Sequence, residues 1–219
     1  MPRPVRVVFT RHADRSDKNK SGITQLGGKK AKLQGQERAL AGQIVKRFSS
    51  FSKRGVSTAK KAQKGHEEIA GKRYKLKTKI DITTPVPKRL EWERIVKENY
   101  KGNKRAATIA WLRGKIPGDV VIKPEIVIPN IIRKRVGLGK RIVRLGTKDI
   151  ILENFTHQEL MLGIFEMLTG KRVDKLAKPF DIKYLESMEI LLYKNGKATL
   201  RIKKATYDVS QRLSLMLNK

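Results

Sequence analysis

Short apolar runs alternate with longer segments of mixed polarity along this chain. Residues 5–10 are apolar and rich in β-branched side chains, which is typical of a buried strand. Residues 79–84 and 148–155 are also predicted strands, and a polar or turn-forming segment follows each of the three runs. Residues 157–169 are apolar on nearly every side of a helix, so they predict a buried helix, and Gly170 is placed to end it.

The segment between the first two predicted strands combines helical spacing with a basic, polar stretch. Thr24 is placed to cap a helix from about residue 25 to 48, whose apolar side chains recur near helical spacing. Residues 49–78 are rich in Ser and Lys with weak periodicity. They predict an extended basic loop that holds at most a short helix over residues 59–70.

The middle of the chain and its last segment are less distinctive. Residues 89–99 and 103–112 predict two helices. Residues 120–127 and 131–136 are apolar or β-branched, and they fit either two strands or a helix followed by a strand. Residues 209–217 are amphipathic and fit a helix or a strand.

A β-hairpin is the clearest local prediction. Asn195-Gly196 separates two apolar, partly alternating runs, 187–193 and 198–202. Asn-Gly between such runs is the strongest short-range hairpin signal, because both residues tolerate the positive φ angles of the turn. Strands that alternate with helices and end in a hairpin predict an α/β sandwich.

Composition and charge exclude several classes of protein. The 219 residues contain no Cys, which excludes a disulfide framework, a zinc–thiolate or iron–sulfur site and a cysteine nucleophile. The hydrophobic content of 39% is sufficient for a core. No apolar run is long enough to cross a bilayer, and the first residues lack the apolar stretch of a signal peptide. We therefore expect a soluble, cytoplasmic protein with no membrane span.

The positive charge is large and unevenly placed. Lys and Arg number 51 against 20 Asp and Glu, a formal net charge of +31. It is densest over residues 53–79 and 133–148. A domain with this charge repels itself unless anions neutralise it, so we expect contact with RNA, DNA or an anionic membrane surface. Aromatic residues are few (6%), which favours phosphate contacts over base stacking. The alternative is a generally lysine-rich surface with no specific partner.

Two of the three histidines follow predicted buried strands, at positions where α/β sheets build their sites. His12 comes after residues 5–10, next to Arg11, and His157 comes after residues 148–155. A neutral imidazole can attack phosphorus near pH 7, and an arginine fork can bind the phosphoryl oxygens. The alternative is that each histidine only caps or packs. The third, His66, lies in the predicted basic loop, where we expect it to be solvated.

Four segments, in order, resemble the histidine phosphatase (phosphoglycerate mutase-like) superfamily. Residues 8–13 (Val-Phe-Thr-Arg-His-Ala) look like its strand with the Arg-His signature. Residues 23–31 look like its Leu-Thr-x-x-Gly-x-x-Gln-Ala helix start. Residues 83–88 (Thr-Thr-Pro-Val-Pro-Lys) look like its second strand end, usually Ser-Ser or Thr-Ser before Pro-x-x-Arg-Ala. Residues 151–157 look like the strand that bears the second histidine.

The resemblance implies an architecture. It implies an α/β fold, a three-layer α/β/α sandwich with a mostly parallel central sheet and a C-terminal β-hairpin. The chain would form one such domain over residues 1–219, with basic insertions near 49–79 and 131–148.

The resemblance also implies roles for particular residues. His12 would be the phosphorylated nucleophile, with Arg11 and His157 holding the phosphoryl group. The second arginine of the family aligns with Lys88, and Arg89 is one position on. A lysine supplies a point charge, not a fork, so either Lys88 acts in this way or Arg89 reaches into the site.

The proton donor is less well defined by the resemblance. Gln158 stands where the family often has an acidic residue after the second histidine, and Glu159 comes next. We predict Glu159 as the catalytic acid, with Asp14, Glu91 and Glu93 as other candidates. No metal or cofactor is required, because arginine, lysine and histidine supply the positive charge.

Two functions therefore stay open. The first is a phosphomonoester hydrolase that acts through a phosphohistidine on a phosphorylated small molecule or phosphoprotein. The second is a catalytically weakened phosphatase-like fold that binds RNA or a ribosomal particle. In either case residues 53–79 and 133–148 are the predicted contacts for RNA or another polyanion.

Overall fold

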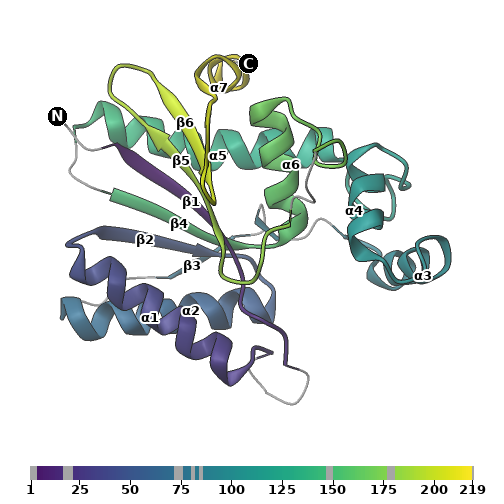
Figure 1. The fold of residues 1–219 in the computed structure, drawn as a ribbon, viewed down its shortest axis with the longest axis horizontal. Coiled ribbons are helices and arrows are strands. Elements are labelled where there is room, and N and C mark those ends of the chain that lie inside the picture. The colour runs from purple at the N-terminus through teal and green to yellow at the C-terminus, as the bar shows by residue number, and fades with distance from the viewer. Residues whose placement is uncertain are drawn as a thin grey trace.

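A mixed β-sheet lies at the centre of the molecule, between two layers of helices (Figure 1). The computed structural model describes residues 4–16, 22–71, 76–79, 82–83, 86–146, 150–176 and 181–218. Within them the strands are β1 (Val5–Arg11), β2 (Ile44–Ser49), β3 (Lys77–Thr78), β4 (Ile150–Thr156), β5 (Ser187–Leu192), β6 (Ala198–Ile202) and β7 (Ala205–Asp208). The helices are α1 (Gln25–Leu40), α2 (Lys53–Ala70), α3 (Arg89–Asn99), α4 (Lys104–Leu112), α5 (Pro124–Arg144), α6 (Gln158–Thr169) and α7 (Ser210–Leu217).

The sheet has a parallel half and an antiparallel half. Its strand order is β3-β2-β4-β1-β5-β6-β7, and the first four strands of this order run parallel. Strands β5, β6 and β7 continue it with antiparallel pairing. The predicted α/β sandwich with a mostly parallel centre and a C-terminal hairpin is confirmed. The carboxyl ends of β1, β2 and β4 consequently meet at one edge of the sheet.

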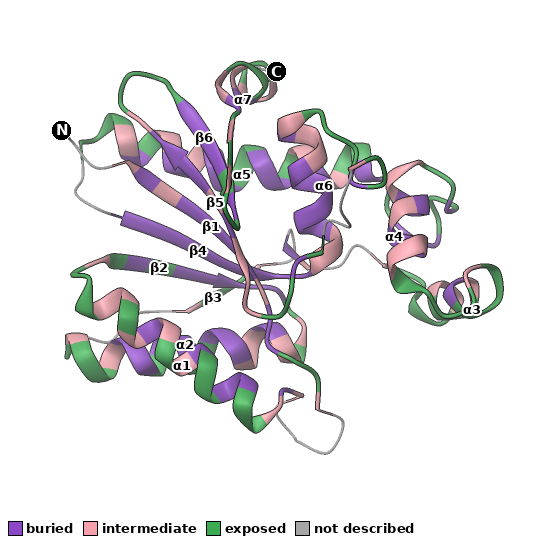
Figure 2. Cartoon of the chain, viewed as in Figure 1, coloured by how far each residue is buried: buried purple, intermediate pink, exposed green. Residues whose placement is uncertain are grey.

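The two helical layers cover different parts of the sheet. Helices α1 and α2 form one layer, in which α2 packs on β2 and β4. Helices α5, α6 and α7 lie on the other side against β1, β5 and β6, and most of the apolar core lies there (Figure 2). Helices α3 and α4 lie beyond α6, at the far end of the molecule (Figure 1).

Helices α1 and α2 pack unusually closely because glycines meet at their contact. A Cβ atom added to Gly35 of α1 would overlap the backbone carbonyl of Ala62, and one added to Gly65 of α2 would overlap that of Lys32. The two backbones therefore approach as near as the absence of side chains allows. This contact holds the α1–α2 pair together and fixes the direction in which α2 points.

A buried ion pair joins two strands beneath α1 and α2. Arg47 of β2 and Glu153 of β4 stand opposite each other in the parallel register, and their side chains are 0% and 1% exposed. The Arg47 Nε donates to Glu153 at 2.8 Å. Arg38 of α1 extends the network, with its guanidinium 3.9 Å from Glu153 and 3.4 Å from Glu189.

The predicted helix over residues 25–48 is wrong in its second half. Thr24 caps α1 as expected, because its side chain accepts a hydrogen bond from the Gly27 N–H. The helix ends at Leu40, and Gly42 takes a positive φ of 66° in the turn that follows. The next residues form β2, since Val45 and Phe48 enter the core and Arg47 finds its partner across the sheet.

The predicted basic loop over residues 49–78 is also wrong, because most of it is α2. Ser52 caps this helix by accepting from the Gly55 N–H, and Gly71, with φ of 64°, ends it. His66 lies on the buried face of α2 and is 1% exposed, so it is not solvated. Its Nε2 lies 3.2 Å from the Gln43 carbonyl oxygen.

Two further predictions need correction. Residues 120–136 contain no strand. Most of them belong to α5, which begins with Pro124 in its first turn and buries apolar residues at helical spacing, including Ile128, Ile131 and Ile132. The predicted strand over 79–84 lies partly outside the described residues. Residues 82–83 within it are not in a strand, and β3 precedes it at Lys77–Thr78.

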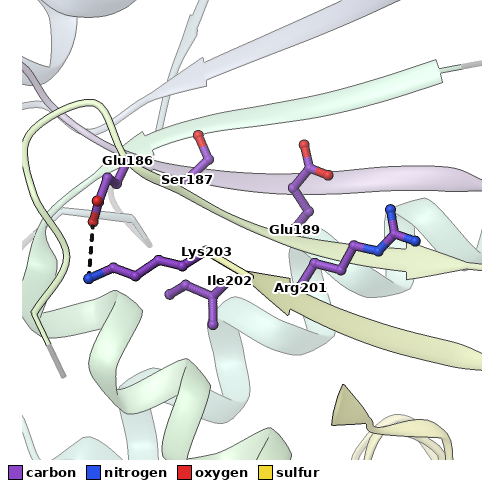
Figure 3. Close-up of a pocket in the computed structure, with 6 residues that line it drawn as sticks. All are labelled: Glu186, Ser187, Glu189, Arg201, Ile202 and Lys203. Carbon is purple, nitrogen blue, oxygen red and sulfur yellow. Dashed lines mark ion pairs between the residues drawn. The ribbon is translucent and has the colours of Figure 1, made fainter. Parts of the chain in front are cut away.

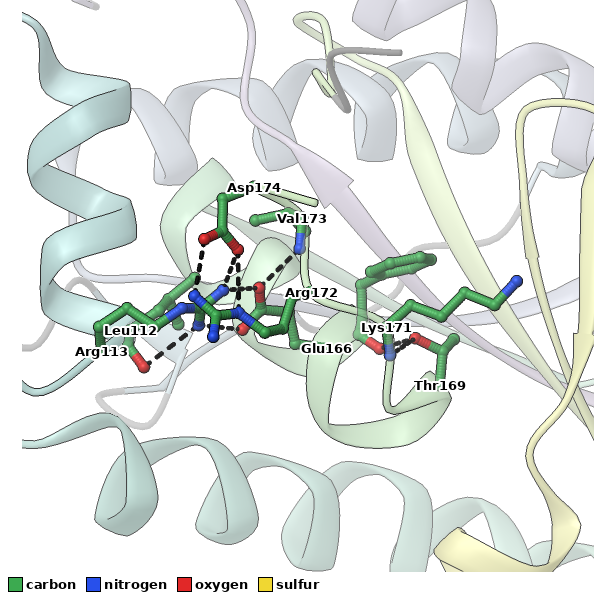
Figure 4. A network of polar contacts seen from close by, with 9 residues as sticks. Leu112, Arg113, Glu166, Thr169, Lys171, Arg172, Val173 and Asp174 are labelled. Carbon is green, nitrogen blue, oxygen red and sulfur yellow. Dashed lines mark hydrogen bonds and ion pairs between the residues drawn. The ribbon is translucent and has the colours of Figure 1, made fainter. Parts of the chain in front are cut away.

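A network of ion pairs fastens α4 to α6 (Figure 4). Arg113, directly after α4, donates to both carboxylate oxygens of Glu166, at 2.7 and 2.6 Å, and also to Asp174. Arg172 donates to Asp174 at 2.8 Å, and the Val173 N–H donates to Glu166 at 2.7 Å. The bond to Glu166 raises the pKa of the Arg113 guanidinium above its usual value.

The two basic stretches of the sequence fall on helices that cover the sheet. Residues 53–79 include α2, and residues 133–148 include the second half of α5. That the chain is one domain with basic insertions stays a prediction. Of the helices in the described ranges, none has the length and apolar character needed to cross a membrane.

Candidate active site

The candidate site lies where the parallel strands end. Arg11 is the last residue of β1, and His12 follows it. His157 follows β4 and stands at the N-terminus of α6. The ring centroids of the two histidines are 4.9 Å apart, with the planes at 74°. The structure thus brings together the two histidines that the sequence placed at strand ends.

His12 is buried and held in one tautomer. Its side chain is 3% exposed, and its Nδ1 lies 3.0 Å from the backbone carbonyl oxygen of Ala13. A carbonyl oxygen only accepts hydrogen bonds, so Nδ1 carries the proton. The Nε2 atom is then the one with a free electron pair, which makes it the nucleophilic atom of the ring.

Arg11 is clamped between the backbone and an aromatic ring. Its Nη1 donates to the carbonyl oxygen of Ile182, and its guanidinium lies 4.1 Å from the ring centre of Tyr184. The ring of Tyr184 is also 6.0 Å from that of His12, tilted by 34°. The guanidinium therefore has a fixed position beside the nucleophile.

Arg54 is a candidate functional residue that the sequence interpretation missed. It lies in the first turn of α2, which starts at the carboxyl end of β2. Its charge lowers the pKa of both His12 and His157. The pKa of Arg54 is itself lowered, first by burial and also by the charges of Arg15 and Arg11. These interactions indicate that Arg54 lies near both histidines, which makes it a candidate for the second arginine.

The signal for Arg54 is present in the sequence. Residues 49–55 read Ser-Ser-Phe-Ser-Lys-Arg-Gly, which keeps the spacing of Ser-Ser-Pro-x-x-Arg-Ala with Phe51 in place of Pro and Gly55 in place of Ala. A Cβ atom on Gly55 would collide with the Ser50 hydroxyl, which explains why the smallest residue stands there. Because the weak periodicity of residues 49–78 predicts a loop, the sequence interpretation places this family motif at residues 83–88 instead. Of these, residues 84–85 lie outside the described residues.

Lys88 and Arg89 are placed away from this cluster. Both stand at the start of α3, which lies beyond α4 in Figure 1. The Lys88 Nζ is 2.6 Å from Asp119, and the Arg89 Nε is 2.9 Å from Glu93. Both cations are exposed and engaged in surface ion pairs, and their role in phosphate binding stays a prediction.

Burial and neighbouring cations keep both imidazoles neutral. Burial, the nearby His157 and Arg54 lower the pKa of His12 to about 3. Burial, Arg54 and Arg11 lower the pKa of His157 to about 4. A neutral His12 is the form that can act as a nucleophile. The surrounding guanidinium groups favour an anion in front of it.

Glu159 is the acidic residue that acts on the cluster. It lies in the first turn of α6, and its negative charge raises the pKa of both His12 and Arg54. Gln158 turns elsewhere and donates to Asp181 at 2.6 Å. Among the other candidates, Asp14 accepts from the backbone N–H of Arg15. Glu91 and Glu93 lie on α3 and pair with basic residues there.

Two polar atoms of the cluster are buried and unsatisfied. Arg11 Nε and His157 Nε2 have no hydrogen-bond partner within the described residues. A buried polar atom without a partner is costly, and such atoms in native proteins call for an explanation. A bound anion with several oxygens would supply partners at this position. Within the same residues, no group of three or more acidic or histidine side chains is arranged to hold a metal ion.

A hollow on the surface, lined by other residues, is chemically different from the histidine cluster (Figure 3). It has a volume of about 330 Å³ and is lined by residues of β5, β6 and their ends: Glu186, Ser187, Glu189, Arg201, Ile202 and Lys203. Two carboxylates disfavour a phosphate here. Lys203 is engaged by Glu186 at 3.7 Å and by the Asp181 carbonyl oxygen at 2.6 Å. The hollow contains no histidine, so it is not the candidate site.

Solved structures of other proteins share the fold of this chain, although sequence comparisons find no relative. No protein-family model matches the chain, and no curated protein sequence matches it significantly. Solved structures do. A mycobacterial glucosyl-3-phosphoglycerate phosphatase matches with a TM-score of 0.61 and 14% identity, over 91% of this chain and 98% of that one. A putative α-ribazole-5′-phosphate phosphatase from Escherichia coli matches with 0.57 and 15%, over 92% and 97%.

A further solved structure supports the same fold. It is described only as mycobacterial hydrolase 1, and it matches with a TM-score of 0.58, 13% identity and coverage of 92% and 99%. This chain therefore shares the fold of these three solved structures, two of which are named phosphatases, and the predicted architecture agrees with them.

Proposed function

We propose that this chain is a phosphomonoester hydrolase that acts through a phosphohistidine at His12. The observation that supports it best is the cluster at the sheet edge, where a buried neutral imidazole lies among His157, Arg11 and Arg54. Two structural neighbours that are named phosphatases agree with this assignment. The substrate class, a phosphorylated small molecule or a phosphoprotein, is part of the proposal.

In this proposal each residue of the cluster has a role. The His12 Nε2 attacks phosphorus, a new N–P bond forms, and the bond from phosphorus to the leaving oxygen breaks. The leaving oxygen takes a proton, for which Glu159 is our candidate donor. Water then attacks the phosphohistidine and gives a proton to the Glu159 carboxylate. The N–P bond breaks, its electron pair returns to Nε2, and inorganic phosphate leaves. The His12 Nδ1–H stays on the Ala13 carbonyl throughout and keeps the ring oriented.

The cations act on the charge that develops on the phosphoryl oxygens. Arg11 and Arg54 approach from β1 and α2, two different elements, so they can contact different oxygens. Arg11 is already fixed by Ile182 and Tyr184, so little reorganisation is needed during the reaction. His157 is neutral, so it donates a hydrogen bond to a phosphoryl oxygen without carrying a positive charge.

The alternative function, a catalytically weakened fold that binds RNA, has less support than the sequence suggested. It rested on lysine in place of the second arginine, on the missing acidic residue after the second histidine and on the charge of +31. Arg54 and Glu159 are our candidates for the first two positions. The large positive charge is still to be explained, but it does not argue against catalysis. We therefore prefer the enzyme.

A kinetic test separates the two functions. Hydrolysis of an aryl phosphate should be measurable for the wild type and abolished in His12→Ala. Arg54→Gln should lower kcat/KM by about 100-fold or more, the usual cost of removing one donor to a developing oxyanion. Arg94→Gln, an exposed arginine on α3 paired with Glu91, is the matched control and should change little.

Each outcome has a clear meaning. Wild-type activity equal to that of His12→Ala would overturn the proposal. If activity fell in Arg89→Gln and not in Arg54→Gln, the assignment of the second arginine would be wrong. Circular dichroism of every variant shows that the fold is retained.

A further inference from the structure

Cations line the outer face of the second half of α5. They are Arg133, Lys134, Lys140, Arg141 and Arg144. At about 100° per residue these five positions fall within an arc of about 120°, and they span about 16 Å along the helix axis. Four of them are exposed, and Lys140 is partly exposed. The buried face of the helix, with Ile131 and Val136, points the other way into the core.

These five charges are not neutralised within the described part of the protein. No acidic residue occurs between Ile126 and Gly146, and none of the five takes part in an ion pair with a described residue. Arg133 has only a long hydrogen bond, 3.4 Å, to Asn130. On α3, by contrast, Arg89 pairs with Glu93 at 2.9 Å. A row of unpaired cations repels itself and is stabilised by an external anion.

Arg135 shows that the exposed cations are a distinct set. It is 5% exposed and lies on the opposite face of α5, with its guanidinium 4.7 Å from the ring centre of Phe48. Arg135 therefore packs in the interior of the protein, whereas the five cations of the outer face are exposed or partly exposed to solvent. Gly137 lies between these cations along the helix, and there Leu217 of α7 packs against α5, 3.9 Å from the position of a Cβ on Gly137.

The topology places this surface far from the candidate site. Helix α5 leads into β4, so its C-terminal half lies at the end of the sheet where β4 begins. His157 and the rest of the site lie where β4 ends. Figure 1 shows α5 running along the sheet toward the amino end of β1. A ligand on the cationic face would leave the phosphate site open.

We propose that this face of α5 binds the phosphate backbone of a nucleic-acid duplex. Three of the five residues are arginines, whose forks match phosphate oxygens. The face contains no aromatic side chain for base stacking, so contacts to the backbone are the ones it can make. A length of about 16 Å corresponds to about five phosphate steps of one strand at 3.4 Å per step.

An anionic membrane is the competing occupant, and the surface suits it less well. A helix that binds at a membrane surface buries its own apolar face among the lipids. The apolar face of α5 is already packed in the core. The exposed apolar residues of this side, Ile126 and Leu145, lie outside the stretch from Arg133 to Arg144.

The test measures binding of a labelled 20-base-pair RNA duplex by fluorescence anisotropy, at KCl concentrations between 50 and 200 mM. We expect binding that weakens steeply with salt and does not depend on base sequence. The variant R133Q/K134Q/R141Q/R144Q should bind at least tenfold more weakly at 100 mM KCl. Its log–log salt slope should fall in magnitude by up to about 4, roughly one for each phosphate that the variant no longer binds.

A control with the same loss of charge separates this surface from net charge. The variant K97Q/K101Q/K104Q/K115Q removes four exposed lysines from the α3–α4 region, and its affinity should stay within about threefold of the wild type. Equal weakening by both variants, or binding insensitive to salt, would overturn the proposal. So would loss of binding to phosphatidylserine vesicles in the α5 variant while duplex binding is unchanged.

Two further readouts make the result independent of the catalytic assignment. Hydrolysis of an aryl phosphate should be the same in the α5 variant as in the wild type, which also shows that the variant folds. Saturating duplex should not inhibit that hydrolysis. If hydrolysis fails in the wild type while duplex binding behaves as described, the enzyme proposal falls and this one stands.

Discussion

The protonation of the two site histidines gives a prediction that can be worked out from the structure. Burial and nearby positive charge lower the pKa of His12 to about 3 and that of His157 to about 4. Replacing Arg54 by Gln removes one of these charges, so it should raise both pKa values. Both imidazoles of the wild type should stay neutral from pH 8 down to about pH 5.

The size of the effect is large. At pH 5 an ordinary imidazole with a pKa of about 6.5 is only about 3% neutral, whereas one with a pKa of about 3 is about 99% neutral. The fraction of His12 in the nucleophilic, neutral form is therefore about 30-fold higher. The same shift affects stability. Near pH 5 the unfolded chain holds about two protons that the folded chain lacks, so the free energy of unfolding falls there by about 2.7 kcal/mol per unit of falling pH. This contribution to stability is present above pH 6.5 and is lost as the pH falls through about 4 for His157 and about 3 for His12.

Two measurements check the prediction. Nuclear magnetic resonance of the imidazole carbons should show no titration of His12 or His157 between pH 8 and 5, with assignments from His12→Asn and His157→Asn. Urea unfolding at pH 7 and pH 5 should give a smaller loss of stability in the variant that combines both substitutions than in the wild type. A midpoint near 6.5 for either imidazole in the folded wild type would refute the reasoning.

Three other predictions concern packing and the mouth of the site. Arg47→Met should lower the free energy of unfolding by about 3–5 kcal/mol, because it leaves Glu153 buried without its partner, and Arg47→Met/Glu153→Met should recover much of that loss in urea unfolding. Gly35→Ala should lower the free energy of unfolding by about 2 kcal/mol or more, since its Cβ would overlap the backbone of α2. Gly137→Ala in α5 should raise the free energy of unfolding by up to about 1 kcal/mol. Equal effects of the two substitutions would contradict the close contact of α1 and α2. Tyr184→Ala should free Arg11 and lower kcat/KM for an aryl phosphate about tenfold, whereas Tyr184→Phe, which keeps the ring, should retain most activity.

Much of the fold could be predicted from local patterns. The run at residues 5–10 forms β1, residues 157–169 form the buried α6, and Asn195-Gly196 forms the turn between β5 and β6. In each case the residues that decide the structure lie next to one another in the chain. Gly196 takes the positive φ, 85°, that the hairpin turn needs.

The parts that local patterns miss depend on distant partners. Strand β2 contains Lys46 and Arg47, which are unusual in a central strand, and Arg47 is buried only because Glu153, 106 residues away, pairs with it. Helix α5 is rich in β-branched residues and has Pro129 in its interior, so its local propensity favours a strand or a break. Burial of one face against the sheet overrides both.

The residues of the candidate site also differ in whether local sequence patterns reveal them. His12, Arg11 and His157 can be found because each follows a recognisable strand. Arg54 is harder to find, because the local pattern predicts a helix where β2 lies and a loop after it, so no predicted strand end draws attention to the Ser-Ser motif before this arginine. Phe51, in the position of the usual proline, hides the pattern further.

The central claim is that His12 carries the phosphoryl group during turnover. It is tested most directly by rapid quenching of the enzyme with a ³²P-labelled aryl phosphate, followed by mapping of the label. We expect up to one phosphoryl group per chain, stable in alkali and labile in acid, located on His12 and absent from His12→Ala. Label on a serine, stable in acid, or hydrolysis that continues in His12→Ala would contradict the claim.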